Sequence, residues 1–187
     1  DITMALASNV IRSSFKTILS TDYIDFKFEN EYIQLIPREP NLSSVETPIL
    51  SVLQSLCSQY SLDHFSRIIL LQPTSPFRTV SNFVNFLETL QGYSDYMSHS
   101  LVSVYPVVDA HPARMYIPSS DSYTLALPSY TQTNSQNLPP CFHRNGCFYS
   151  FSAYDILRGN LYSENLSLFH MNYISSFNID TIPDFHI

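Results

Sequence analysis

The stretch Arg67–Gln72 reads RIILLQ and runs directly into Pro73-Thr74-Ser75-Pro76. Its apolar residues follow one another without a break, which is typical of a strand that is buried on both sides of a parallel sheet. A helix is expected directly afterwards, because apolar side chains beyond the prolines recur at helical spacing: Val80, Phe83, Phe86, Leu87 and Leu90. This strand, loop and helix form the unit from which the fold class is predicted.

Strand and helix patterns alternate on both sides of this unit. We expect further helices at residues 2–13, 49–60 and 153–158, and further strands at residues 16–20, 32–37, 101–108, 114–117, 146–151 and 173–177. Such alternation predicts an α/β fold with a doubly wound, mostly parallel sheet. Ligands of these sheets bind beyond the carboxyl ends of the strands, so Thr21-Asp22 and Gln72–Ser75 are the first candidate positions for a site.

The segment from Asp109 to Pro140 interrupts the alternation. It is rich in serine, tyrosine, proline, threonine and asparagine. Irregular segments of this length are uncommon in compact domains and usually carry a function. We therefore divide the chain into an α/β domain, residues 1–108 and 141–187, and an excursion, residues 109–140. We expect the excursion to pack against a second copy of the chain in a homodimer.

The charge and the cysteine content exclude several classes of protein. Sixteen acidic residues against nine basic ones give a net charge of −7, so we expect neither a nucleic acid nor a membrane as a partner. No apolar run approaches the length of a membrane span. The cysteines are three in number, and an odd number argues against a disulfide framework. Because the first residues also lack the basic start of a signal peptide, the chain is predicted to be cytoplasmic.

Four stretches of the chain, in order along the sequence, resemble the motifs of one family. They are Leu70–Thr79 (LLQPTSPFRT), Val102–Val104 (VSV) with His111–Arg114 (HPAR), Leu138–Pro140 (LPP) with Asn145–Tyr149 (NGCFY), and Phe177–Thr181 (FNIDT). Weaker matches are Ser20–Asp22 (STD) and Arg38–Leu42 (REPNL). Over essentially its whole length, the chain is similar to the N-acylneuraminate cytidylyltransferases, or CMP-sialic acid synthetases.

The resemblance implies a reaction and the partners that it needs. The family transfers CMP from CTP to a nonulosonic acid such as N-acetylneuraminate and releases pyrophosphate, on a Rossmann-like nucleotidyltransferase sheet. Magnesium offsets charge on the triphosphate, and the chemistry depends on positioning and electrostatics. The family uses its excursion to form a homodimer, in which a basic residue reaches the acceptor site of the other subunit.

The resemblance also implies roles for individual residues. Those expected to bind the sugar are Gln72, Thr74, Ser75, Arg114, Tyr149 and Tyr162; those expected to bind the nucleotide are Arg38 and Arg78; those expected to hold the metal and to act in catalysis are Asn178 and Asp180. The residues alone leave structural roles open. Gln72 can bond the backbone at a strand end, Arg78 can anchor the loop, and both tyrosines can be core residues.

Several positions depart from the family pattern. Asn178 stands where the family has the first of two metal-binding aspartates, so Mg²⁺ is expected to bind weakly and only together with the nucleotide. Ser135 and His143 stand where arginines are expected, although Arg144 lies next to the second position. No glycine precedes Gly92, and the family's first strand and Gly-rich phosphate loop have no counterpart in this sequence.

Two functions therefore stay open. In the first, the chain is most of an active cytidylyltransferase, and the 187 residues alone show little turnover. In the second, it is a diverged or truncated non-catalytic homologue that acts as a sugar- or nucleotide-binding module or as a dimer partner. The lost metal carboxylate and pocket cations favour the second function, whereas the intact Gln72–Arg78 loop favours the first.

Overall fold

The computed structural model describes residues 15–23, 25, 31–63, 65–107 and 109–186. The helix expected at residues 2–13 lies outside these residues. The described helices are α2 (Ile49–Gln59), α3 (Val80–Gln91) and α4 (Ala153–Leu157). The described strands are β1 (Thr17–Thr21), β2 (Ile33–Pro37), β3 (Arg67–Leu70), β4 (His99–Val107), β5 (Tyr116–Ser119), β6 (Ser122–Leu125), β7 (Cys141–Ser152) and β8 (Asn165–His170). None of these helices combines the length and the apolar character that a membrane crossing requires.

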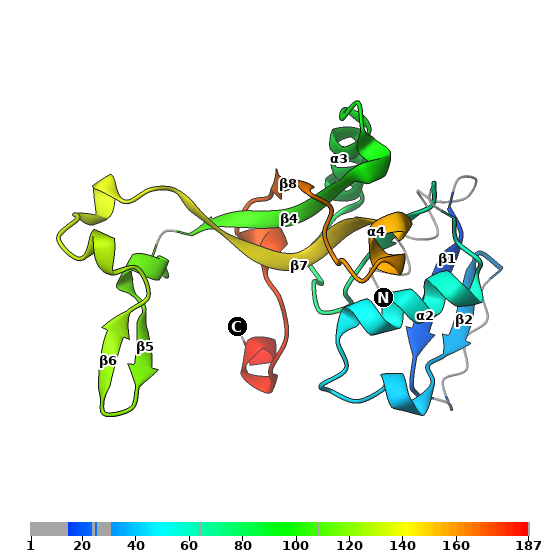
Figure 1. Ribbon diagram of the computed structural model, residues 1–187, viewed down its shortest axis with the longest axis horizontal. Coiled ribbons are helices and arrows are strands. Elements are labelled where there is room, and N and C mark those ends of the chain that lie inside the picture. Colours follow the sequence, from blue (N-terminus) through cyan, green and yellow to red (C-terminus); the bar gives the residue numbers. More distant parts are fainter. Residues whose placement is uncertain (1–14, 24, 26–30, 64, 108, 187) are drawn as a thin grey trace.

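The largest sheet has four strands in the order β3-β7-β4-β8 (Figure 1). β7 pairs antiparallel with both β3 and β4, whereas β4 and β8 are parallel. β1 and β2 form a separate parallel pair, and β5 and β6 form an antiparallel hairpin. The architecture is therefore mixed α/β, with small sheets that combine parallel and antiparallel pairs.

The expected doubly wound, mostly parallel sheet is wrong. That prediction treated the connections as helical crossovers, which parallel neighbours need. Between β4 and β7 the chain instead runs out into the excursion and returns, so that β7 lies antiparallel to β4. The position predicted for the RIILLQ strand within the sheet is also wrong, because β3 is an edge strand of the four-stranded sheet and its residues are only half-buried.

Helices cover both faces of the four-stranded sheet, and this cover explains the apolar run in β3. Ile69 packs with the cluster under α3, whereas Ile68 and Leu70 pack with the cluster under α2 and α4, as alternate residues of a strand must. The cluster under α3 includes Phe83, Phe86, Leu90, Leu101 and Phe148. The cluster under α2 and α4 includes Leu53, Cys57, Phe151, Ala153 and Ile156. Helix cover on both faces therefore produces the apolar pattern whichever way the neighbouring strands run.

The loop between β3 and α3 is fixed at its far end. The Thr79 hydroxyl accepts a hydrogen bond from Asn82 N (3.1 Å), and Asn82 Oδ1 accepts one from Thr79 N (3.0 Å). This capping box sets the first residue of α3. One position earlier, Arg78 is 1% exposed and donates to the carbonyl of Cys147 at 3.0 Å. The loop is therefore tied to β7 at the residue that follows Gly146.

The strand expected at residues 173–177 is wrong. This region holds a 3-10 helix, Ile174–Ser176, and the strand lies earlier, in β8, which pairs with β4. The apolar side chains that favoured a strand are exposed, Tyr173 by 68% and Ile174 by 75%. The chain then passes the loop after β3 and forms another 3-10 helix, Ile182–His186 (Figure 1).

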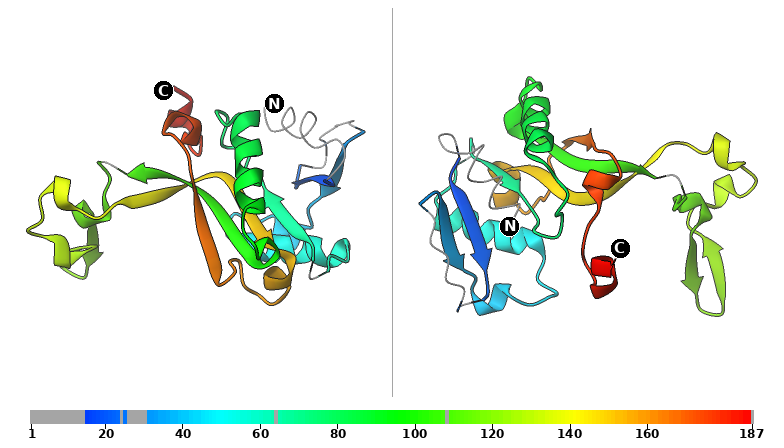
Figure 2. Two further views of the ribbon diagram at one scale, coloured as in Figure 1. Left: turned by 90° about the horizontal axis from the view of Figure 1, so that it is seen from above. Right: turned by 180° about the vertical axis from the view of Figure 1, so that it is seen from behind.

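The excursion stands clear of the rest of the chain. β4 and β7 extend together beyond the helices, and the β5–β6 hairpin lies at the far end of this arm (Figures 1 and 2). The strand expected at residues 114–117 begins only at Tyr116. The hairpin exposes Tyr116, Ile117 and Tyr123. It is therefore an apolar surface held away from the core of its own chain.

Candidate functional site

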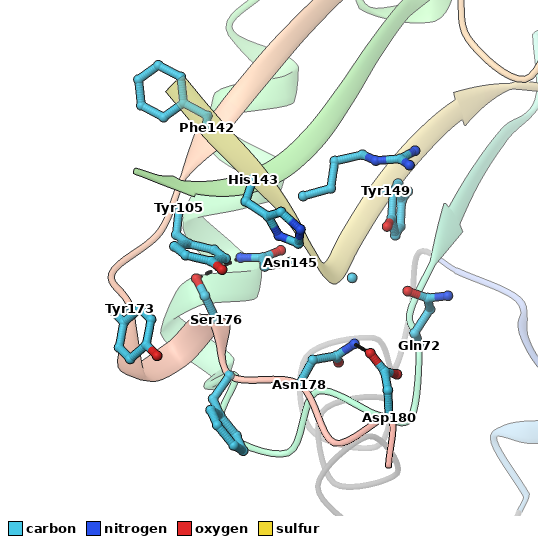
Figure 3. A pocket seen from close by; sticks show the side chains of 13 residues that line it. Gln72, Tyr105, Phe142, His143, Asn145, Tyr149, Tyr173, Ser176, Asn178 and Asp180 are labelled. Atoms are coloured by element: carbon cyan, nitrogen blue, oxygen red, sulfur yellow. Dashed lines mark hydrogen bonds between the residues drawn. The ribbon is translucent and has the colours of Figure 1, made fainter. Parts of the chain in front are cut away.

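A pocket of about 610 Å³ lies where β7 passes the C-terminal segment of the chain (Figure 3). Its walls come from Gln72, which follows β3, from β4, from β7 and from the residues that follow β8. Several residues that the resemblance assigns to the sugar and the metal line it together, namely Gln72, Tyr149, Asn178 and Asp180. Four separate segments of the chain thus meet in one cavity.

Gly146 allows two of these side chains to converge. Its φ is +73°, in the left-handed region that glycine adopts without strain. A Cβ at this position would lie 2.7 Å from Gln72 Oε1 and 3.4 Å from Asn178 Nδ2. The two amides therefore pack against the bare backbone of β7, and a larger residue at position 146 would have to displace Gln72.

The C-terminal segment is held against the loop that follows β3. The backbone N–H of Ile179 donates to the carbonyl of Thr74 at 2.7 Å. Ser75, which is 1% exposed, donates its hydroxyl to Asn178 Oδ1 at 2.9 Å. Asn178 Nδ2 in turn donates to Asp180 Oδ2 at 2.7 Å (Figure 3). Thr74 and Ser75 therefore support the pocket by holding Asn178 and Asp180 in place.

Asn145, 3% exposed, ties β7 to its surroundings just before Gly146. Its Oδ1 accepts hydrogen bonds from Ser103 Oγ (2.5 Å) and from the backbone N–H of Cys147 (3.2 Å). Its Nδ2 donates to Ser176 Oγ (2.8 Å) and contacts Met171 Sδ (3.3 Å). All four hydrogen-bonding positions of the buried amide are used, so the group is satisfied and fixes the backbone beside the pocket.

Arg144 and Tyr149 form the basic side of the pocket, whereas Tyr162, which was predicted to bind the sugar, is not among the residues that line it. Arg144 Nη1 donates to the hydroxyl of Tyr162 at 2.6 Å. Burial raises the pKa of Tyr149, and the nearby Arg144 guanidinium acts in the opposite direction. Tyr149 therefore stays protonated at neutral pH and can donate a hydrogen bond. A guanidinium has five N–H groups, so Arg144 keeps donors for an anionic ligand.

Aromatic side chains form the opposite side of the pocket (Figure 3). The ring centroid of Tyr105 lies 5.4 Å from that of His143 and 5.6 Å from that of Tyr173. The Phe142 ring lies 4.6 Å from the His170 ring, in an edge-to-face arrangement. Apolar ring surface on one side and converging polar groups on the other suit a ligand with a ring face and several polar substituents.

The arginines predicted from the resemblance lie elsewhere. Arg38 lines a second pocket of about 510 Å³ beside α2, where it donates to the backbone carbonyl of Ser20 at 3.2 Å. Arg78 is buried, which lowers its pKa to about 10, and it lines neither pocket. Arg114 lies on the excursion, donates to Ser135 Oγ at 3.2 Å and is outside the pocket of its own chain.

The residues of the pocket do not fit a resident magnesium ion. Among the described residues that line it, Asp180 carries the only carboxylate. The amide oxygen of Asn178 already accepts the hydroxyl of Ser75. Throughout the described part of the chain, no three His, Cys, Asp or Glu side chains gather as metal ligands do. Mg²⁺ requires near-octahedral oxygen ligands, which these residues do not supply. Weak Mg²⁺ binding that depends on the nucleotide stays a prediction.

Part of the pocket was missed in the sequence. Tyr105 follows the VSV motif, and Phe142 lies between the LPP and NGCFY motifs, so their position beside a motif was the available signal. Tyr173 and Ser176 gave no such signal, because the region was interpreted as a strand. Their contribution depends on the 3-10 helix Ile174–Ser176, which brings the chain back towards β4 and β7.

The sequence was compared with protein-family models and with curated proteins. A scan against protein-family models finds no match for the chain, and a search of curated proteins finds no significant match. The motifs and the geometry of the pocket are therefore the observations from which a function is inferred.

Proposed function

We propose that this chain is a cytidylyltransferase-like protein that transfers CMP from CTP to a nonulosonic acid of the sialic type. In this reaction the anomeric hydroxyl of the sugar attacks the α-phosphorus of CTP and loses its proton. The bond between the α-phosphorus and the bridging oxygen breaks, and pyrophosphate leaves. Catalysis of such a transfer comes mainly from positioning and from electrostatic stabilisation.

The observation that carries the proposal is the convergence of separate motifs on one pocket. Gln72 belongs to the first motif, Tyr149 to the third and Asp180 to the fourth, and all three line the same cavity. Ser75 of the first motif also holds Asn178 of the fourth through a hydrogen bond. The motifs were recognised from residue identity alone, so their meeting in space is independent support for a shared site.

The chemistry of the pocket suits a polyhydroxylated acid. The Gln72 carboxamide both donates and accepts, and the Tyr149 hydroxyl donates, which matches the needs of sugar hydroxyls. Arg144 supplies a permanent positive charge for a carboxylate. In the part of the chain that the structure describes, no salt bridge engages Arg144. The aromatic side, with Tyr105 and Tyr173, offers apolar surface to a sugar ring.

The nucleotide half of the proposal is supported by the second pocket. Arg38 lines it together with Ser55, Ser58 and Gln59, which supply neutral hydrogen-bonding groups. Because the proposed cosubstrate is a nucleoside triphosphate and the cysteines are unpaired, we include a cytoplasmic location in the proposal. Use of the pocket by two subunits, with Arg114 supplied by the other copy, is part of the same proposal.

A non-catalytic homologue is the second candidate, and one observation favours it. Position 178 carries an amide, so that Asp180 is the single carboxylate among the described residues that line the pocket. A charge-stabilised phosphoryl transfer loses rate when a charged group is replaced by a neutral one. Even slow release of pyrophosphate from CTP in the presence of N-acetylneuraminate distinguishes the two, since a binding module produces none.

We expect N-acetylneuraminate to bind more tightly than its methyl ester, in which the carboxylate charge is removed. Arg144→Gln should lower the affinity for the acid by about three- to fivefold, because an exposed ion pair contributes below about 1 kcal/mol. The affinity for the ester should stay unchanged. Gln72→Ala should weaken both ligands alike, because its amide meets groups that both ligands have. Isothermal titration calorimetry measures each affinity.

Arg158→Gln is the matched control for this experiment, since Arg158 is exposed, stacks over Tyr154 and lies outside the pocket. Its affinities should equal those of the wild type. Failure of the wild-type chain to bind either ligand would contradict the sugar part of the proposal. Equal affinity for acid and ester would show that Arg144 does not recognise the carboxylate.

We expect the chain to form a two-fold dimer through the β5–β6 hairpin. Tyr116 and Ile117 are 67% and 53% exposed, and burying such side chains between subunits is favourable. Replacing both with serine should raise the dimer dissociation constant at least about tenfold, as measured by sedimentation velocity. Val45→Ser serves as control, because Val45 is a fully exposed apolar residue elsewhere. A monomeric wild-type chain at micromolar concentration would contradict the expectation.

A further inference from the structure

We propose that Asn178 is a positioning residue whose amide holds the Asp180 carboxylate in the pocket. If position 178 carried a carboxylate instead, a cation shared by the two carboxylates would be needed to hold them there. The inference rests on the proposed function only in taking this pocket as the site of transfer. Its evidence is the set of contacts around one side chain.

The first contact fixes which way the amide points. Asn178 Oδ1 lies 2.9 Å from Ser75 Oγ, and Nδ2 lies 2.7 Å from Asp180 Oδ2. A carboxylate accepts hydrogen bonds and donates none, so the group that faces Asp180 has to be the NH₂. The opposite orientation would bring two oxygens together at hydrogen-bonding distance. The charge on Asp180 therefore determines that the oxygen of Asn178 faces Ser75 and points away from Asp180.

Packing holds the amide in that place. Asn178 lies against Gly146, where a Cβ would come within 3.4 Å of Nδ2 and 3.6 Å of Oδ1. The next residue, Ile179, is fixed through its backbone N–H to the carbonyl of Thr74 at 2.7 Å. Ser75, which donates to the amide, is itself 1% exposed. The side chain is thus confined by β7, by the loop after β3 and by Asp180.

The amide at position 178 changes the interaction between positions 178 and 180 at this corner of the pocket. Two carboxylates at positions 178 and 180 would repel each other at this separation unless a proton or a cation lay between them. With an amide at position 178, the same separation becomes a charge-assisted hydrogen bond. The contact between Asn178 and Asp180 therefore needs no cation, in agreement with the poor fit of the pocket to a resident Mg²⁺ ion. The role of Asn178 towards Asp180 is that of a donor.

The test exchanges the amide for a carboxylate and measures cation binding without nucleotide or sugar. Binding of Mn²⁺ is followed through the electron paramagnetic resonance signal of the free ion, in the wild type, in Asn178→Asp and in the double variant Asn178→Asp/Asp180→Asn. The double variant carries the same net charge as the wild type, with amide and carboxylate exchanged. We expect Asn178→Asp to bind Mn²⁺ at least about tenfold more tightly than the other two proteins, because only this variant pairs two carboxylates.

Thermal unfolding supplies the second readout. Asn178→Asp should melt at a lower temperature than the wild type in the presence of EDTA, and Mn²⁺ should restore the loss. Dependence of folding on Mn²⁺ in this variant would support the proposal in the same way. Failure to fold with or without Mn²⁺ would overturn it, since a cation would then not replace the amide.

Two further results would overturn the proposal. One is an Mn²⁺ affinity of Asn178→Asp equal to that of the wild type. The other is tight Mn²⁺ binding by the wild type that Asn178→Ala reduces tenfold or more, which would make Asn178 a metal ligand. None of these readouts involves CTP or a sugar, so they are independent of whether the chain binds N-acetylneuraminate.

Discussion

Replacing Gly146 with alanine is expected to lower the affinity for N-acetylneuraminate by tenfold or more. The new Cβ would lie 2.7 Å from Gln72 Oε1, a separation at which the glutamine has to move. Gln72 is flexible at this end, so the collision costs little stability, but it removes the amide from the position in which it faces the pocket. Loss of a well-placed polar contact corresponds to about 1.4 kcal/mol of binding free energy.

Gly159→Ala is the matched control for this substitution. Gly159 also has a positive φ, +87°, but a Cβ there would meet nothing within 4 Å. Both alanine variants should lose about 1–2 kcal/mol of unfolding free energy through left-handed backbone strain. Urea unfolding compares these losses, and calorimetry compares sugar affinity. Equal affinity in the two variants would contradict a specific effect of Gly146 on the pocket.

A double variant identifies the side chain through which Gly146 acts. In the Gln72→Ala background, Gly146→Ala should cause no further loss of affinity, because the side chain that the Cβ displaces is already gone. Additive losses would instead show that the substitution acts through Asn178 or through the backbone of β7.

The sequence predicted local structure well because local structure depends on nearby residues. The apolar spacing around Phe83, Phe86 and Leu90 identified the buried face of α3. Gln72 follows β3 closely and lines a pocket, although Thr74, Ser75 and Arg78 of the same motif do not line it. In both cases the deciding residues lie within a few positions of one another.

The direction of the strands was not available from the same patterns. The apolar residues of β3 indicate that helices cover the sheet on both faces. This cover is the same whether the neighbouring strands run parallel or antiparallel. Whether β7 runs with or against β4 depends on the path of the excursion, which has no periodic pattern. The role of Asn178 was equally hidden, because it depends on Ser75 and Gly146, which are distant in sequence and adjacent in space.

Asn145→Asp should be the most destabilising of the proposed substitutions, by about 3 kcal/mol or more near neutral pH. The change preserves the shape of the side chain and removes its donor. Ser176 Oγ already donates its proton to the carbonyl of Asn172 at 2.7 Å, so it cannot satisfy a carboxylate oxygen without breaking that bond. The buried network would therefore contain an uncompensated charge.

The loss should depend on pH in a direction that the network determines. A protonated carboxyl group can donate to Ser176, so folding should raise the pKa of the new group above its value in the unfolded chain, which is about 3.9. The folded state then binds more protons than the unfolded state above that pH. The variant should consequently approach wild-type stability near pH 4 and lose stability as the pH rises through the folded pKa.

Urea unfolding near pH 4 and near pH 7 measures this difference, with Asn160→Asp as the control at an exposed position. The control should stay within about 0.5 kcal/mol of the wild type at both pH values. Equal destabilisation of Asn145→Asp at the two pH values would show that the carboxylate finds donors within the network. In that case the loss of stability would come from a cause other than an uncompensated buried charge.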